Sequence, residues 1–114
     1  MIKKLEKQIQ AEILRGFQIE TGAQLWRQNT GAASFENKGR RQFVRFGIKG
    51  AADLTGITPD GRRLEIEVKR PGNKPTAAQI AYGQMILEYG GVYILAHSLE
   101  EALESYDRQM GGSE

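Results

Sequence analysis

The segment LEIEVKR at residues 64–70 carries the residues with the clearest capacity for chemistry. If this segment is a strand, alternation places Glu65, Glu67 and Lys69 on one face and the aliphatic residues on the other. So short a pattern is common by chance and is ordinary on a solvent-exposed strand. The same groups can also form part of a metal site, in which Glu65 is either a second ligand or a solvated carboxylate at the sheet edge.

Another carboxylate, Asp53, is expected to lie beside this strand. The turn sequence TPDGRR favours a hairpin with strands at about 53–57 and 63–69. Carboxylates from two adjacent strands can converge on one divalent cation, and the amine of Lys69 can orient an attacking water or offset charge on a phosphate. The sequence therefore predicts a site that contains Asp53, Glu67 and Lys69.

The composition restricts which metal such a site can hold. The chain has no cysteine and a single histidine, His97, which excludes thiolate sites and a multi-histidine zinc site within one chain. Oxygen ligands remain, and they favour Mg²⁺, Mn²⁺ or Ca²⁺.

Glu6 and Gln79 are further candidates, each with an ordinary alternative. On a helical wheel Glu6 falls within the apolar stripe of the first predicted helix, where a carboxylate is costly unless it is paired or binds metal. The alternative is that Glu6 lies at the edge of that stripe and reaches water, and Glu12 occupies the stripe's other margin. Gln79 follows Thr76 at capping-box spacing, so its amide either caps a helix or bonds a water or phosphate at the site.

Basic residues are concentrated between positions 27 and 45, although the net charge of the chain is only +2. This stretch contains one acid, Glu36, and such clustering is typical of a surface that contacts phosphates, although a solvated loop has the same composition. The residues predicted to contact DNA are Arg27, Asn29, Lys38, Arg40, Arg41 and Arg45.

The elements that position these residues alternate along a chain of 114 residues. Hydrophobic periodicity, caps and turn residues predict helices at about 2–15, 77–88 and 99–108 and strands at 23–29, 43–48, 53–57, 63–69 and 92–96. Gly16 is expected to end the first helix, and residues 30–42 are expected to form a polar loop. The order predicts one α/β (α+β) domain over 1–108, with a mixed central sheet flanked by helices, and a flexible tail over 109–114.

Neither a membrane partner nor secretion is expected. No stretch approaches about 18 consecutive apolar residues, and the N-terminus MIKKLEKQIQ has no apolar signal region. A cytoplasmic location is therefore predicted.

The segments LEKQIQAEI, WRQNTGA, GIKGAADLTG, EIEVKRPGNKPTAAQ and GGVYILAHSLEEAL occur in an order that resembles the virus-type replication-repair nuclease (VRR-NUC) domain, a branch of the PD-(D/E)XK nuclease superfamily. The resemblance covers about residues 5–103 and implies a restriction-endonuclease-like core. The catalytic residues that it implies are Glu6, Asp53, Glu67, Lys69 and Gln79. It also implies that Mg²⁺ or Mn²⁺ is held by Glu6, Asp53, Glu67 and the main-chain carbonyl of Val68. Ala52 stands where the family commonly has proline, and this difference removes no ligand.

The function that this resemblance implies is that of a stand-alone metal-dependent DNA endonuclease in replication or repair. Similar stand-alone domains often act as homodimers on branched DNA such as four-way (Holliday) junctions. The alternative is a non-catalytic nucleic-acid-binding module that uses the basic loop at 38–45, and a third possibility is an accessory protein with solvated acids. The acidic set is more than phosphate binding requires, which favours the nuclease.

Overall fold

The computed structural model describes residues 4–28, 31–37, 39–46 and 48–111, with the backbone alone described for the strands between 31 and 46. Its elements in chain order are α1 (Glu6–Thr21), β1 (Gln24–Arg27), β2 (Gly31–Asn37), β3 (Arg40–Phe46), β4 (Leu54–Ile57), β5 (Arg63–Val68), α2 (Ala77–Glu88), β6 (Val92–Ala96) and α3 (Leu99–Gln109).

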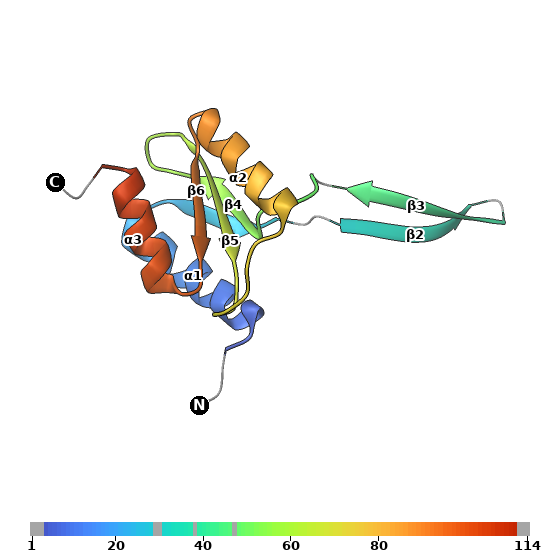
Figure 1. Cartoon of the computed structure of the whole chain (residues 1–114), viewed down its shortest axis with the longest axis horizontal. Coiled ribbons are helices and arrows are strands. Elements are labelled where there is room, and N and C mark those ends of the chain that lie inside the picture. The colour runs from blue at the N-terminus through green and yellow to red at the C-terminus, as the bar shows by residue number, and fades with distance from the viewer. Residues whose placement is uncertain (1–3, 29–30, 38, 47, 112–114) are drawn as a thin grey trace.

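Four strands form a mixed sheet in the order β1-β4-β5-β6. The β1–β4 and β4–β5 pairs are antiparallel, whereas β5 and β6 run parallel, as the intervening helix predicts. Helices α1 and α3 cover one face of the sheet and α2 covers the other (Figure 1). The predicted mixed sheet flanked by helices is therefore confirmed.

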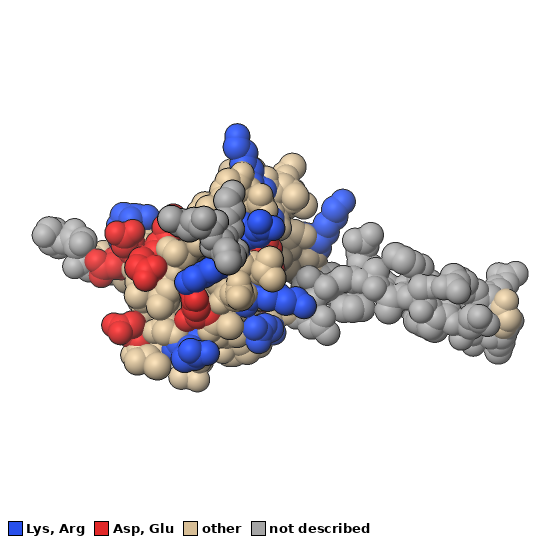
Figure 2. Space-filling model, turned by 90° about the horizontal axis from the view of Figure 1, so that it is seen from below, with Lys and Arg blue, Asp and Glu red and all other residues tan. Residues whose placement is uncertain are grey.

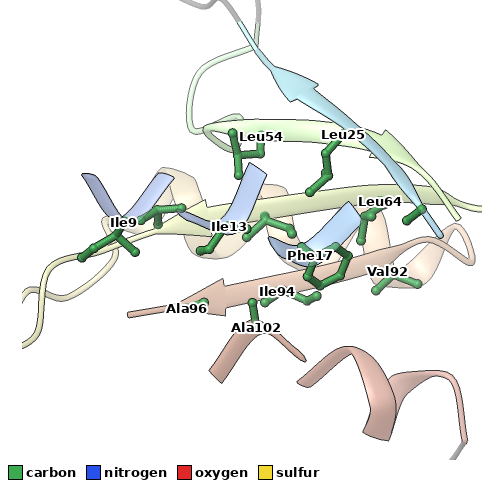
Figure 3. Packing of buried hydrophobic residues seen from close by; sticks show 13 residues of the cluster. Ile9, Ile13, Phe17, Leu25, Leu54, Leu64, Val92, Ile94, Ala96 and Ala102 are labelled. Atoms are coloured by element: carbon green, nitrogen blue, oxygen red, sulfur yellow. The ribbon is translucent and has the colours of Figure 1, made fainter. Parts of the chain in front are cut away.

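The larger core lies between the sheet and the pair α1 and α3. Ile13 and Phe17 of α1 are fully buried, and Figure 3 shows them packed against residues of the central strands such as Leu64 and Ile94. Full burial of an aliphatic or aromatic side chain contributes about 1.5–3 kcal/mol. This packing fixes β5 from one side and leaves the opposite face of β5, with its acids, turned toward α2.

The first helix is longer than predicted, because Gly16 does not end it. Leu99 of α3 packs directly over Gly16, where a Cβ atom would lie 2.4 Å from the leucine Cδ2. The glycine therefore permits close contact between two helices. The helix ends instead at Gly22, whose φ of 77° is left-handed and whose N–H bonds to the Gln18 carbonyl.

The polar loop predicted for residues 30–42 is wrong over most of its length. Strands β2 and β3 pair antiparallel from Gly31↔Phe46 to Asn37↔Arg40, and Gly39 with φ 76° lies in the turn between them. Figure 1 shows this two-stranded ribbon extending away from the domain body, and the longest dimension of the molecule is 61 Å. A glycine at the turn of two β-forming runs is a hairpin pattern.

The second half of the chain follows its predicted caps closely. Thr76 caps α2 by accepting from the Gln79 N–H, and Ser98 caps α3 by accepting from the Glu101 N–H. At the far end of α3, the Gln109 amide both accepts from the N–H and donates to the carbonyl of Tyr93, and so satisfies part of the exposed edge of β6. Among the described helices, none has the length and apolar character that a membrane span requires.

Candidate active site

Asp53 and Glu67 lie opposite each other at one end of the β4–β5 pair. The antiparallel register aligns Leu54 with Ile66, and the next pair in that register is Asp53 and Glu67. Asp53 Oδ2 accepts a hydrogen bond of 2.8 Å from the Val68 N–H. The structure therefore brings together the two acids predicted from adjacent strands.

Glu67 is only 2 % exposed, and its two carboxylate oxygens have different surroundings. Oε2 accepts from Gln79 Nε2 at 2.8 Å and lies 3.6 Å from the ammonium of Lys69. Oε1 is buried and has no hydrogen-bond partner among the described residues. Since buried polar atoms are normally satisfied, this oxygen is a candidate metal ligand.

The capping interpretation of Gln79 is confirmed, and the same amide also contacts the site, whereas a bond to water or phosphate stays a prediction. Its Oε1 accepts from the Thr76 N–H at 2.8 Å and completes the capping box, while its Nε2 donates to Glu67. One side chain therefore fixes the start of α2 and orients the carboxylate of β5.

The two acids disfavour full ionisation of each other. The pKa of Glu67 is raised to about 8, first by burial and then by the negative charge of Asp53, while Lys69 opposes the rise. The pKa of Asp53 is also raised, because the effect of burial exceeds the opposing effect of the hydrogen bond from the Val68 N–H. A cation between the two carboxylates would remove this unfavourable interaction.

Glu6 is half-buried at the first turn of α1 and acts on this pair through its charge, which raises the pKa of both Asp53 and Glu67. Within the described ranges, no three histidine or acidic side chains form a ready metal cage. Two acids, Asp53 and Glu67, therefore lie directly together, and Glu6 is near enough to act on both through its charge. This number suits Mg²⁺, which is usually bound by one or two carboxylates and keeps several waters.

The main-chain carbonyl of Val68 is directed toward the same side as Asp53. In an extended strand the N–H and C=O of one residue point to the same neighbour, and the Val68 N–H points to the Asp53 carboxylate. Two carboxylates, one of them with an unpartnered oxygen, and a carbonyl make an oxygen donor set that fits Mg²⁺ or Mn²⁺.

Glu65 corrects the sequence analysis, in which a solvated edge carboxylate was the ordinary expectation. Its exposure is 0 %, because α2 covers this part of β5. Four side chains donate to its two oxygens, and sequence reasoning included none of them in the site: Gln28, Thr55, Arg63 and Tyr82. With both oxygens occupied in this way, Glu65 is not a free metal ligand.

Glu12 lies away from the acid pair. Its carboxylate is 2.8 Å from Lys4, and both line a hollow of about 640 Å³ between α1 and the start of α3. His97 lines the same hollow and pairs with Glu101 at 2.8 Å. Neither residue joins Asp53 and Glu67.

The residues predicted to contact DNA fall into two groups. Four lie on described strands, with exposed Arg27 at the end of β1 and three on β3, namely Arg40, Arg41 and Arg45. The other two, Asn29 and Lys38, lie outside the described residues. On the domain body, Figure 2 shows lysine and arginine side chains mostly toward the ribbon, and acidic side chains mostly toward the opposite end.

The sequence of this chain matches no protein-family model and no curated protein. The resemblance to the VRR-NUC domain therefore stays a prediction, and the function is argued from the site.

Proposed function

We propose that this protein is a Mg²⁺- or Mn²⁺-dependent DNA endonuclease with a restriction-endonuclease-like core. The observation that carries the proposal is the buried carboxylate of Glu67, whose Oε1 has no partner among the described residues, opposite Asp53 and next to the Lys69 amine. A buried acid opposite a second, half-buried acid is costly to maintain in a purely structural role.

Each residue of the site has a distinct part in the proposed reaction. Bound by Asp53, Glu67 and the Val68 carbonyl, a divalent ion would supply a water of lowered pKa and neutralise charge on the scissile phosphate. Lys69, whose side chain is 14 % exposed, would orient the attacking water and offset negative charge as the phosphorus–oxygen bond forms. Gln79 holds Glu67 in one orientation, and Glu6 adds negative charge that favours a cation.

The ribbon of β2 and β3 supports DNA as the substrate. It carries Arg40, Arg41 and Arg45, and a two-stranded ribbon has dimensions that fit the major groove. In the backbone register of the ribbon, Arg41 pairs with Glu36 and Arg45 pairs with Ala32. Branched DNA such as a four-way junction is the proposed substrate, on which such an arm could contact a neighbouring duplex.

Pairing of two copies belongs to the same proposal, because symmetric cutting of a junction needs two active sites. Helix α2 also has exposed apolar residues, with Ile80 in its first half, Leu87 near its end and Tyr89 just after its last residue. A helix that is hydrophobic all round is typically covered on all sides, and these residues supply apolar area that a homodimer would bury.

A non-catalytic nucleic-acid-binding module is the second candidate, and the arginine-bearing ribbon is the observation that favours it. Such a module would bind DNA with a steep salt dependence and would not cut it. It gives no reason for two adjacent acids with raised pKa values, one buried and one half-buried, since acids oppose phosphate binding when no metal is present.

The test uses linear duplex, nicked duplex, flap and four-way junction DNA, each with EDTA, Mg²⁺ or Mn²⁺. We expect cutting of the junction in either metal and none in EDTA, with a dimer mass in light scattering of the same sample. Glu67→Ala should abolish cutting while its circular dichroism spectrum stays that of the wild type. Undiminished cutting by Glu67→Ala, or DNA binding by the wild type without any cutting, would overturn the proposal.

A further inference from the structure

Gln28 and Glu65 form a second polar cluster next to the acid pair. Gln28 contacts the backbone around Asp53, and Glu65 contacts Gln28. We propose that these two are positioning residues that hold Asp53 in the orientation needed to bind a metal. The metal-binding part of this inference rests on the proposed function, whereas the placement of Asp53 does not. Neither residue would touch the ion or the DNA.

Gln28 donates hydrogen bonds to the backbone carbonyls on both sides of the Asp53 Cα atom. Its side-chain Nε2 donates to the Ala52 carbonyl at 2.9 Å, and its main-chain N–H donates to the Asp53 carbonyl at 2.9 Å. Asp53 immediately precedes β4, so the ladder of that strand does not yet fix it. The two bonds from Gln28 supply this constraint, and they set the direction in which the Asp53 side chain leaves the backbone.

Glu65 in turn fixes the amide of Gln28. The same Nε2 donates to Glu65 Oε1 at 3.1 Å, so this one amide nitrogen links the Glu65 carboxylate to the Ala52 carbonyl. The fully buried position of Glu65 leaves its carboxyl group no water to exchange with, so loss of a protein donor there is costly.

The donors to Glu65 come from each element around the site. Thr55 lies on β4, Arg63 on β5 and Tyr82 on α2, one helical turn after Gln79. The buried carboxylate therefore ties the segment that carries Asp53 to the helix that carries Gln79. Such outer partners typically cost 10–100-fold in metal affinity or activity when removed, because the ligands lose their preset geometry.

The experiment compares two variants that each remove one donor to Glu65. Gln28→Ala also frees the Ala52 carbonyl, whereas Thr55→Val leaves both bonds of Gln28 to the Asp53 segment intact. Both should lose some stability, but only Gln28→Ala should disturb Asp53. The pair therefore separates positioning from general support of the fold.

The first readout needs no metal, because the Val68 N–H donates to Asp53 and reports on its placement. By amide hydrogen exchange in EDTA, Gln28→Ala should speed exchange at Val68 on the order of tenfold. The Lys69 amide, which donates to Ala96 on the opposite side of β5, is the internal control and should change no more than in Thr55→Val. Unchanged exchange at Val68, or equal acceleration in Thr55→Val, would overturn the inference.

The second readout is Mn²⁺ affinity by titration calorimetry, in which Gln28→Ala should bind about tenfold more weakly and Thr55→Val should match the wild type. Glu65→Leu should weaken binding as Gln28→Ala does, and Glu65→Gln should restore it, because its amide oxygen can still accept from Gln28. Equal affinity in Gln28→Ala and the wild type would contradict the role in metal binding. If the wild type binds no Mn²⁺, the proposed function fails, while the Val68 amide still decides whether Gln28 positions Asp53.

Discussion

Glu65 and Glu67 lie one side-chain repeat apart on the same face of β5, and both are buried beneath α2. Around Glu65, hydrogen-bond donors from three strands or their ends and from α2 reach both carboxylate oxygens. At Glu67, one carboxylate oxygen accepts a hydrogen bond from Gln79 and forms an ion pair with Lys69. The other oxygen has no partner among the described residues, and a second acid, Asp53, lies opposite. Both oxygens of the first carboxylate have donors within the protein, whereas one oxygen of the second is left for the proposed cation.

The difference shows that burial alone does not identify a functional acid. A carboxyl group can be buried at modest cost when donors surround it, as they do at Glu65. A buried acid whose neighbour is another acid, as at Glu67, has its pKa raised and would be stabilised by the proposed cation. The count of donors at each oxygen distinguishes the two roles.

The largest expected difference comes from making the same substitution at both positions. Glu67→Gln should lower the rate of Mg²⁺-dependent cutting by more than about 100-fold, because loss of a ligand should exceed the effect of losing an outer partner. Glu65→Gln should cut within a few-fold of the wild type, since its amide oxygen can keep the bond from Gln28. Initial rates on a four-way junction measure both.

Similar losses at the two positions would remove the distinction between the acids. A large loss in Glu65→Gln together with normal cutting by Glu67→Gln would reverse their roles. Melting curves recorded on the same preparations ensure that folded proteins are being compared.

A smaller difference is expected in the dependence of stability on pH. The pKa of Glu67 is about 8 in the folded protein against an ordinary value of 4.5, so folding favours its protonated form. In EDTA this contribution is fully present below about pH 4.5 and is lost as the pH rises through about 8, and the raised pKa of Asp53 acts in the same direction. The groups facing Glu67 are Asp53, Lys69, Glu6, Gln79 and Tyr93, whose own pKa is raised by burial and by the charge of Glu67.

The melting temperature in EDTA should therefore fall between pH 5 and 8.5, by about 4–8 °C for each kcal/mol lost. Glu67→Gln should flatten the profile because its side chain does not titrate, and Mg²⁺ should stabilise the wild type more at pH 8.5 than at pH 6. A Glu67→Gln profile as steep as that of the wild type would assign the pH dependence to another group.

Local signals in the sequence were sufficient for much of the fold. Thr76 and Ser98 begin their helices as predicted because a side-chain cap needs only neighbouring residues, and the turn before β5 depends on local backbone preferences. The prediction that Gly16 ends the first helix was wrong, because the glycine is needed there for close packing of Leu99. Leu99 is distant in sequence and contacts Gly16 only in the folded protein. The ribbon was missed because its glycine and polar residues suit a loop as well as a hairpin.

The site shows the same division. Glu67, Lys69 and Gln79 were predicted because spacing along a strand and at a helix start is local, and the structure brings them into contact. The environment of Glu65 was predicted wrongly because its burial depends on the placement of Tyr82 on α2. Gln28 carries no local signal at all, and only the pairing of β1 with β4 brings it to the Asp53 backbone.

Titration of the metal-free protein with Mn²⁺ at pH 8 tests most directly whether Asp53 and Glu67 form a cation site. Calorimetry in two buffers of different ionisation enthalpy also measures the protons released. The account predicts saturable binding with proton release by the wild type and loss of that binding in Glu67→Gln, while Glu65→Gln binds normally. No binding by the wild type, or undiminished binding by Glu67→Gln, would contradict it.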